Sequence, residues 1–226
     1  MDDRATDRDF EELSRSISQL RRDHKAEGLS EADLHPDPFV QFGRWMNDAL
    51  EAGIILPNAM TLATAAADAV PSARMVLLKG VDPRGFVFYT NYESRKGQEL
   101  TANPNAALVF YWNALERQVV IAGGVVKVDR DEAEDYFRSR PLGSRLGAWA
   151  SPQSTVIASR EELEDRAAEL QRTYADGEVP IPPDWGGFRL TPVRFEFWQS
   201  RPNRLHDRFR YGRAPQDVWK LERLAP

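Results

Sequence analysis

The chain has no cysteine and very little histidine. Its 226 residues contain only three His, at positions 24, 35 and 206. Disulfides, iron–sulfur clusters and cysteine-ligated zinc are therefore excluded. The three histidines do not stand at the spacing of a metal-binding motif, so we predict no metal site.

Positive charge is not in excess, and long apolar runs are missing. The formal net charge is -5, which argues against nucleic acid as the main partner. No run of about 18 apolar residues occurs, so we predict no membrane span. The N-terminus is acidic and polar, unlike a signal peptide. With the lack of cysteine, this favours a cytoplasmic protein.

No Gly/Ser-rich linker or internal repeat divides the chain. A hydrophobic content of 42% over 226 residues is enough for one domain with its own core. Residues 1–36 are charge-dense, but Phe10, Leu13, Ile17 and Leu20 stand at helical spacing. We therefore predict a flexible N-terminal segment over 1–36, with a short amphipathic helix, and a single domain over 37–226.

The most informative stretch runs from Arg74 to Lys96. Residues 75–78 and 86–90 are apolar runs typical of strands. Between them lies D-P-R-G at 82–85, in which Pro favours a turn and Gly accepts positive φ. We predict that the two runs pair as a hairpin.

Polar residues surround this hairpin. Arg74 and Lys79 bracket the first run, and T-N-Y-E-S-R-K-G follows the second run at 90–97, before a predicted helix. Two cations and several hydroxyls at a helix start suit a phosphate group. A solvated turn is the alternative that this pattern leaves open.

Periodicity and capping signals predict the other elements. Helices are expected at 38–53, 97–102, 131–138 and 159–174, the last with a capping box of Ser159 and Glu162. Further strands are expected at 59–64, 106–112, 118–128, 188–190, 194–199, 204–211 and 218–221. Their order predicts a mainly β, α+β fold: an antiparallel barrel with peripheral helices.

Two more groups of polar residues are candidates for a site. Tyr136, Arg140 and Ser144 are spaced by four and could converge on a phosphate, or form a helix edge with a solvated Arg. Arg204, His206 and Arg208 alternate along a predicted strand, with Leu205 and Phe209 on its other face. Three such polar side chains cannot be buried without partners, which favours a functional role.

Six sequence blocks carry a resemblance to a known family. They are L-E-R-Q-V at 115–119, R-P-L-G-S-R-L-G-A-W-A-S-P-Q-S at 140–154, W-G-G-F-R at 185–189, E-F-W-Q at 196–199, R-L-H-D-R-F at 204–209 and R-L-A-P at 223–226. With these blocks and the 74–96 stretch, the chain resembles the pyridoxamine 5'-phosphate oxidase family from about Asp37 onward. The resemblance implies an FMN-binding split barrel and a homodimer with its flavin sites at the subunit interface.

The resemblance also implies an activity. Enzymes of this family oxidise pyridoxamine 5'-phosphate and pyridoxine 5'-phosphate to pyridoxal 5'-phosphate, with FMN as cofactor, O2 as acceptor and H2O2 as product. Two alternatives are a related flavin oxidase of phenazine biosynthesis and an FMN- or pyridoxal-phosphate-binding carrier without turnover. The complete set of substrate-phosphate residues favours the vitamin B6 enzyme.

Site residues follow from the resemblance by position. The flavin would be bound by Arg74, Met75, Val76, Leu77, Leu78, Lys79, Tyr89, Thr90, Arg95, Lys96, Gln118, Gln153, Ser154, Trp198 and Arg208. The substrate phosphate would be held by Lys79, Tyr136, Arg140 and Ser144. Arg204 and His206 would be catalytic and contact the substrate ring. An N-terminal segment would cover the substrate with Arg21, Arg22, Asp23 and His24.

The chain departs from the family pattern at two positions. His24 stands where the family commonly has Tyr, and Leu56 stands where it commonly has Asp. The family Asp lies near the reactive end of the substrate. Substrate handling, rather than the flavin site, is therefore where this chain is expected to differ.

Overall fold

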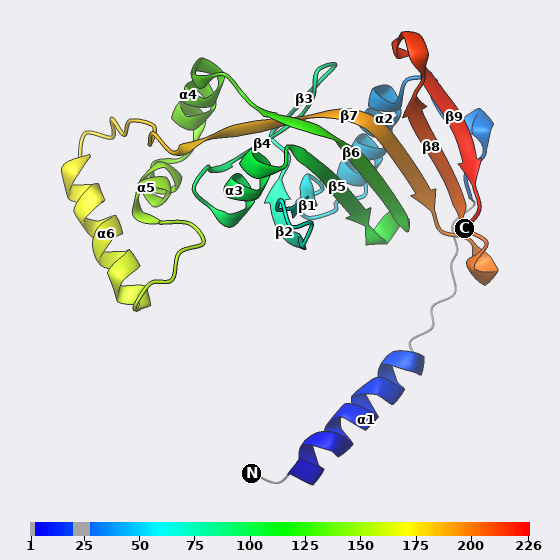
Figure 1. Cartoon of the computed structure of the whole chain (residues 1–226), viewed down its shortest axis with the longest axis horizontal. Helices are drawn as coiled ribbons and strands as arrows, with labels where there is room; N and C mark the ends of the chain where they lie inside the picture. The colour runs from blue at the N-terminus through cyan, green and yellow to red at the C-terminus, as the bar shows by residue number, and fades with distance from the viewer. Residues whose placement is uncertain (1–2, 20–27) are drawn as a thin grey trace.

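The computed structural model describes residues 3–19 and 28–226, and its centre is a nine-stranded antiparallel sheet (Figure 1). The strands follow the order β2-β1-β5-β6-β7-β4-β3, and β8 and β9 extend the sheet from β7. Their bounds are β1 Ala59–Ala65, β2 Pro71–Leu77, β3 Gly80–Asp82, β4 Gly85–Asn91, β5 Asn105–Trp112, β6 Arg117–Lys127, β7 Trp185–Gln199, β8 Asp207–Arg213 and β9 Trp219–Leu224. The predicted mainly β fold is confirmed.

The described residues also form α-helices. They are α1 Asp3–Gln19, α2 Pro38–Glu51, α3 Arg95–Ala102, α4 Arg130–Ser139, α5 Leu142–Ala150 and α6 Arg160–Thr173. The helices α4, α5 and α6 gather at one end of the molecule, and β8 and β9 lie at the other (Figure 1). Helix α5 was not predicted, because Pro141, Gly143 and Gly147 lower the helix propensity of its sequence.

One prediction about the central hairpin was wrong. Strand β2 pairs with β1, with Met75 opposite Thr61, and not with β4. The turn at 82–85 does form a hairpin, but it joins the short strand β3 to β4. The chain changes neighbours after Leu78, since Leu78 N donates to Asn58 O while Lys79 N donates to Val87 O. Alternation identifies strands but not their partners, which tertiary packing decides.

Strand β7 is the longest of the sheet and connects its two ends. It spans 15 residues and pairs with β6 along its length, with β4 through its first part and with β8 through its last part. The sequence predicted two strands here because Pro192 interrupts the run. The structure accommodates Pro192 at a register shift opposite Ala122 and Gly123, where a bulge tolerates the missing N–H.

Helix α2 packs against the barrel interior. Asp37 caps it by accepting a hydrogen bond from Phe39 N at 2.8 Å, and Pro38 follows at the first helical position. The ring of Phe42 meets that of Phe86 edge to face at 5.0 Å, and Trp45 meets Phe197 at 5.1 Å. Each such pair adds about 0.5–1.5 kcal/mol beyond area burial. This core fixes the strands that carry the candidate site.

Candidate functional site

A cavity of about 340 Å³ opens between β2, β4 and the start of α3. It is lined by Arg74, Met75, Val76, Leu77, Lys79, Tyr89, Thr90, Lys96, Tyr136, Arg140, Gln153 and Trp185. All of these except Trp185 were named from the sequence as site residues. The structure therefore brings most of the flavin set and most of the substrate-phosphate set into one place.

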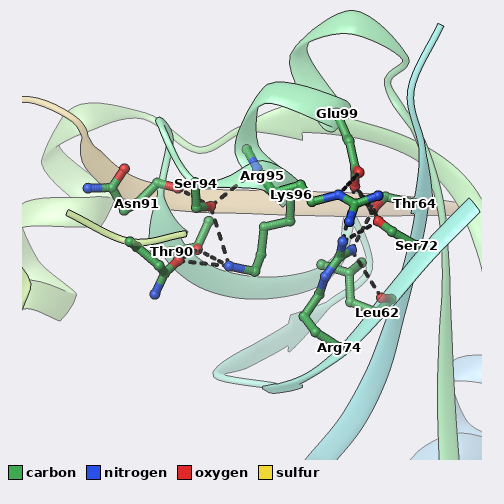
Figure 2. Close-up of polar contacts among 12 residues, drawn as sticks. Leu62, Thr64, Ser72, Arg74, Thr90, Asn91, Ser94, Arg95, Lys96 and Glu99 are labelled. Atoms are coloured by element: carbon green, nitrogen blue, oxygen red, sulfur yellow. Dashed lines mark hydrogen bonds and ion pairs between the residues drawn. The ribbon is translucent and has the colours of Figure 1, made fainter. Parts of the chain in front are cut away.

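Lys96 lies between hydroxyl and amide oxygens at the start of α3 (Figure 2). Its Nζ donates to Gln153 Oε1 at 2.7 Å and to Thr90 Oγ1 and Ser94 Oγ at 3.3 Å. Burial and the nearby Arg74 guanidinium lower the pKa of Lys96 to about 8. Ser94 caps α3 by accepting from Gly97 N. The cavity thus contains a buried cation close to a helix N-terminus, an arrangement that binds anions.

Arg74 is held by a buried carboxylate on α3, that of Glu99 (Figure 2). Arg74 Nη2 donates to Glu99 Oε2 at 3.0 Å, and Arg95 Nε donates to Glu99 Oε1 at 2.8 Å. Arg74 also donates to Thr64, Ser72 and the Leu62 carbonyl. The residues Arg74, Arg95, Lys96 and Glu99 together have a formal charge of +2, which is complementary to a phosphate monoester dianion.

Glu99 stays ionised despite its burial. Burial raises the pKa of its carboxyl, but hydrogen bonds from Ser72, Thr64, Arg95 and Arg74 outweigh that effect and hold the pKa at about 2. The carboxylate is therefore an anion at neutral pH, and it orients both guanidinium groups.

Arg140 joins the first cavity to a second one of about 240 Å³. The second cavity is lined by Asn91, Arg140, Ser144, Gly147, Ala148, Ser151, Gln153 and Trp185. The Arg140 guanidinium lies 4.8 Å from the centre of the Trp185 ring. Its Nη1 is buried and has no hydrogen-bond partner among the described residues, and burial lowers the pKa of Arg140. A buried guanidinium in this state favours an anionic ligand.

Aromatic rings form one wall of the first cavity. Tyr89 stacks on Tyr136 with ring centres 3.9 Å apart and on Trp185 at 5.5 Å. Burial raises the pKa of Tyr89 to about 12, so its hydroxyl is neutral at physiological pH. This wall is flat and apolar, and it suits a planar ring system.

A second group of predicted residues lies outside this cavity. Gln118, Trp198 and Arg208 are direct neighbours across β6, β7 and β8. The His206 ring lies 4.7 Å from that of Trp198. We call Gln118, Trp198, His206 and Arg208 the strand cluster. Trp185 of the cavity and Trp198 of the cluster both lie on β7, 13 residues apart (198 minus 185), so at about 3.3 Å per residue the two groups are separated by up to about 40 Å along that strand.

The prediction of a strand over 204–211 was wrong at its start. Strand β8 begins at Asp207, and Arg204 ends a 3-10 turn, Pro202–Arg204, with φ of 61°. Arg204 and His206 therefore do not share a strand face with Arg208. Leu205 and Phe209, which were predicted to share a face, differ in burial: Leu205 is 68% exposed and Phe209 is fully buried. The positive φ of Asn203 and Arg204 breaks the alternation.

The remaining predicted residues take different places. Leu78 is buried in the core, and the Arg95 side chain is 63% exposed beside Glu99. Ser154 follows the cavity residue Gln153 with φ of 73°. Leu56 is exposed and has φ of 53°, a conformation that Asp adopts more readily than Leu. The predicted lid residues Arg21, Arg22, Asp23 and His24 lie outside the described residues.

Sequence reasoning missed Glu99 and Trp185. Glu99 stands four residues after Arg95, and this spacing could have indicated an ion pair. Trp185 stands in a sequence block used for the resemblance, but a lone Trp more often fills a core. Neither position carries a signal of its own that points to a ligand.

The described residues contain neither a cluster of metal ligands nor a helix that could cross a membrane. Within residues 3–19 and 28–226, no group of three His, Cys, Asp or Glu side chains is placed to hold a metal ion. None of the helices in these ranges is long and apolar enough to cross a membrane.

This geometry defines the class of protein: it is an antiparallel split barrel with a cationic cavity at its edge. The family model described as "Pyridoxamine 5'-phosphate oxidase" matches residues 46–174. The model described as "Pyridoxine 5'-phosphate oxidase C-terminal dimerisation region" matches residues 185–226. The chain belongs to the pyridoxamine 5'-phosphate oxidase family, and it contains the region through which that family dimerises.

Curated relatives match over nearly the whole chain. The pyridoxine/pyridoxamine 5'-phosphate oxidase of Gloeothece citriformis is 58% identical over 95% of this chain and 100% of its own length. The enzyme of the same name from Burkholderia vietnamiensis is 57% identical over 93% of this chain and 99% of its own length.

Solved structures share the fold. PhzG from Burkholderia lata, solved with tetrahydrophenazine-1-carboxylic acid, matches with a TM-score of 0.83 and 34% identity over 89% of this chain and 99% of its own. A pyridoxamine 5'-phosphate oxidase-related, FMN-binding protein from Nostoc punctiforme matches with a TM-score of 0.67 and 18% identity over 85% of this chain and 100% of its own. The second match concerns the fold alone.

Proposed function

We propose that this protein oxidises pyridoxine 5'-phosphate and pyridoxamine 5'-phosphate to pyridoxal 5'-phosphate with FMN as its cofactor. The alcohol reacts with O2 to give the aldehyde and H2O2. The amine reacts with O2 and water to give the aldehyde, ammonia and H2O2. The observation that carries the proposal is the buried Arg140 guanidinium, whose Nη1 has no partner among the described residues, between two adjoining cavities.

The residues around the first cavity fit FMN. Lys96, Arg95 and Arg74 would hold its phosphate, with the Thr90 hydroxyl and the Gln153 amide as further hydrogen-bonding groups. The β2 backbone from Met75 to Leu77 lines the same cavity and would run along the flavin. When bound, FMN would supply the hydride acceptor and the route to O2.

The substrate phosphate would lie between Lys79, Tyr136, Arg140 and Ser144. Lys79, Tyr136 and Arg140 line the first cavity, and Arg140 and Ser144 line the second. The planar guanidinium of Arg140 can donate two parallel hydrogen bonds to phosphate oxygens. Holding the substrate ring in one pose beside the flavin would lower the barrier by up to about 7–11 kcal/mol through orientation.

The strand cluster would complete the site from a second subunit. Its Trp198 lies at the opposite end of the long strand β7 from the cavity residue Trp185, so one chain does not bring both halves to a single flavin. A homodimer with FMN at its interface would place the Gln118, Trp198 and Arg208 of one subunit against the cavity of the other. Arg204 and His206 would then reach the substrate ring as the catalytic pair.

The test is a spectrum followed by an oxygen assay. The purified protein should be yellow, with one FMN per subunit of a dimer, and it should consume O2 when pyridoxine 5'-phosphate is added. Pyridoxine without its phosphate should react far more slowly. A colourless protein that FMN does not reconstitute would refute the flavin assignment.

The same assay separates the alternatives. A carrier would bind FMN or pyridoxal 5'-phosphate but consume no O2. An oxidase of the PhzG type would consume O2 with a reduced phenazine precursor in place of the B6 phosphates. Identity of 58% to a B6 enzyme against 34% to PhzG favours the B6 substrates.

A further inference from the structure

The loop from Arg201 to His206, which joins β7 to β8, has an unfavourable backbone. Asn203 and Arg204 both have positive φ, at 58° and 61°. Residues other than glycine adopt this region only at a cost in free energy, and here two do so in succession. Such a conformation persists only when surrounding contacts determine it. We call residues 201–206 the β7–β8 loop.

Asp207 supplies these contacts directly after the loop. Its buried carboxylate accepts hydrogen bonds from Arg201 Nε at 2.5 Å, Leu29 N at 2.9 Å and Arg223 Nη1 at 2.7 Å. Burial raises the pKa of Asp207, but the bonds from Leu29, Arg201 and Arg223 outweigh it and lower the pKa overall. One ionised group therefore ties together residue 29, the β7–β8 loop and strand β9.

Gly28 makes room for this arrangement. A methyl group at Gly28 would overlap the guanidinium of Arg201, so the Arg201 side chain lies against the bare backbone there. Gly28 also has φ of +92°, which favours glycine. The contact orients the Arg201 side chain that donates to Asp207.

Arg201 in turn fixes His206. The backbone N–H of Arg201 donates to His206 Nδ1 at 3.1 Å, so Nδ1 acts as the acceptor and, in the neutral form of the ring, the proton is on Nε2. The ring also packs against Trp198 at 4.7 Å. The contacts run from Gly28 and Asp207 through Arg201 to His206 and determine which nitrogen of the ring can donate.

We propose that Asp207 is a positioning residue for the β7–β8 loop, acting through Arg201 and the backbone at Gly28 and Leu29 to fix Arg204 and the His206 tautomer. This inference rests on the proposed function, because it takes Arg204 and His206 to contact the substrate. Asp207 itself does not touch the substrate in this proposal.

The experiment compares Asp207→Asn, Gly28→Ala and a control, Gly177→Ala, in the flavin-loaded dimer. Gly177 has φ of +83° and no atom within 4 Å of an added methyl, so the control carries similar backbone strain without an overlap. Steady-state kinetics with pyridoxine 5'-phosphate give KM and kcat for each variant. Ring ¹⁵N spectra of the histidines give the His206 tautomer without any need for turnover.

We expect Asp207→Asn and Gly28→Ala to raise KM at least fivefold and to mix the His206 tautomers, with FMN content unchanged. Gly177→Ala should keep the wild-type KM and tautomer even if its melting temperature falls. A KM within twofold of wild type and an unchanged tautomer in Gly28→Ala would overturn the inference, even if Asp207→Asn fails to fold. An equal change in Gly177→Ala would overturn it as well. A wild type that consumes no O2 but has the His206 tautomer described here would refute the proposed function and leave the positioning role supported by the tautomer.

Discussion

At the scale of single residues, the cavity depends on cations whose charge is set by their surroundings. Lys96 has a pKa of about 8, so it is mostly charged at neutral pH and loses its proton just above it. Glu99 keeps its charge and holds two arginines in place. The same residue types on an open surface would be fully hydrated and would bind an anion weakly.

Lys96 should make FMN binding depend on pH. Below a pH of about 8 the ammonium is present and attracts the phosphate, and above it the charge is lost, so affinity should fall by up to about tenfold per pH unit between 8 and 9. Lys96→Arg should remove this dependence, because a guanidinium stays protonated. The measurement is FMN titration of the flavin-free protein at pH 7–9, with Lys220→Arg, at an exposed position, as the control. A wild-type affinity that is flat over this range would contradict the assignment.

Loss of the Arg140 side chain should weaken substrate binding and leave FMN binding unchanged. Loss of hydrogen bonds worth about 1.5–3 kcal/mol each to a charged group predicts that Arg140→Ala raises the KM for pyridoxine 5'-phosphate by about tenfold to a hundredfold or more. Arg140→Lys should restore little of the lost affinity, because an ammonium group lacks the planar guanidinium that donates two parallel hydrogen bonds. The assay is steady-state kinetics with FMN content measured in parallel. A defect that disappears when FMN is supplied in excess would place Arg140 at the flavin instead.

Much of the cavity could be predicted at this scale, because strands, turns and cation-rich helix starts have local signals. Arg74, Lys96 and Arg140 stood in such contexts or in family blocks. Glu99 and Trp185 could not be predicted, because their roles arise only when α3 folds back towards β1 and when β7 passes beneath Tyr89. A strand was wrongly predicted to start at Arg204, because the positive φ of Asn203 cannot be recognised from the alternation of polar and apolar residues.

At the scale of elements, the start of α3 decides where the cationic cavity lies. Gly97 is close enough to the Tyr92 backbone that an added methyl would overlap it. That close approach lets Lys96 donate to Thr90 near the end of β4 and to Ser94 at the start of α3. The fold thus requires glycine at a position where the helix itself would favour alanine.

Two helical glycines should respond oppositely to alanine. Gly97→Ala should lower the free energy of unfolding by about 2 kcal/mol or more through overlap with backbone, and it should weaken FMN binding. Gly43→Ala in α2, where nothing lies within 4 Å of the new methyl, should stabilise by up to about 1 kcal/mol through helix propensity. Urea unfolding of the two variants measures both effects. Equal stability of the two would show that the close approach of α3 is not required.

Pairing was the part of the fold that sequence could not supply. The strands at 75–78 and 86–90 were recognised, yet β2 pairs with β1 and β4 pairs with β3 and β7. A short loop usually joins paired strands, but here β3 intervenes as a separate strand of three residues. Its brevity leaves too few residues for a pattern to be seen.

At the scale of the whole molecule, the site residues fall into two groups on one sheet. The cavity lies near β2, β4 and α3, and the strand cluster lies across β6, β7 and β8. The matched dimerisation region covers residues 185–226, which include Trp198, His206 and Arg208. Most of the strand cluster therefore lies within the region that matches the family's dimerisation model.

Mixed dimers should test whether each site draws on two chains. Arg140→Ala disables the cavity and Arg208→Ala disables the strand cluster, so each homodimer should be nearly inactive. When the two variants are co-expressed, half of the dimers should be mixed and each should hold one intact site, which gives about a quarter of wild-type activity. If purified mixed dimers have almost no activity, the cavity and the strand cluster of one chain serve the same site.

Strand β7 also limits how this chain can change in length. It has Trp185 of the cavity near its start and Trp198 of the strand cluster near its end, and it pairs with β4, β6 and β8. A one-residue insertion or deletion would turn every following side chain to the other face and would break all three pairings at once. Length variation among relatives should therefore collect in surface connections, such as the stretch between α6 and β7 or the turn between β8 and β9, while β7 keeps a constant number of residues.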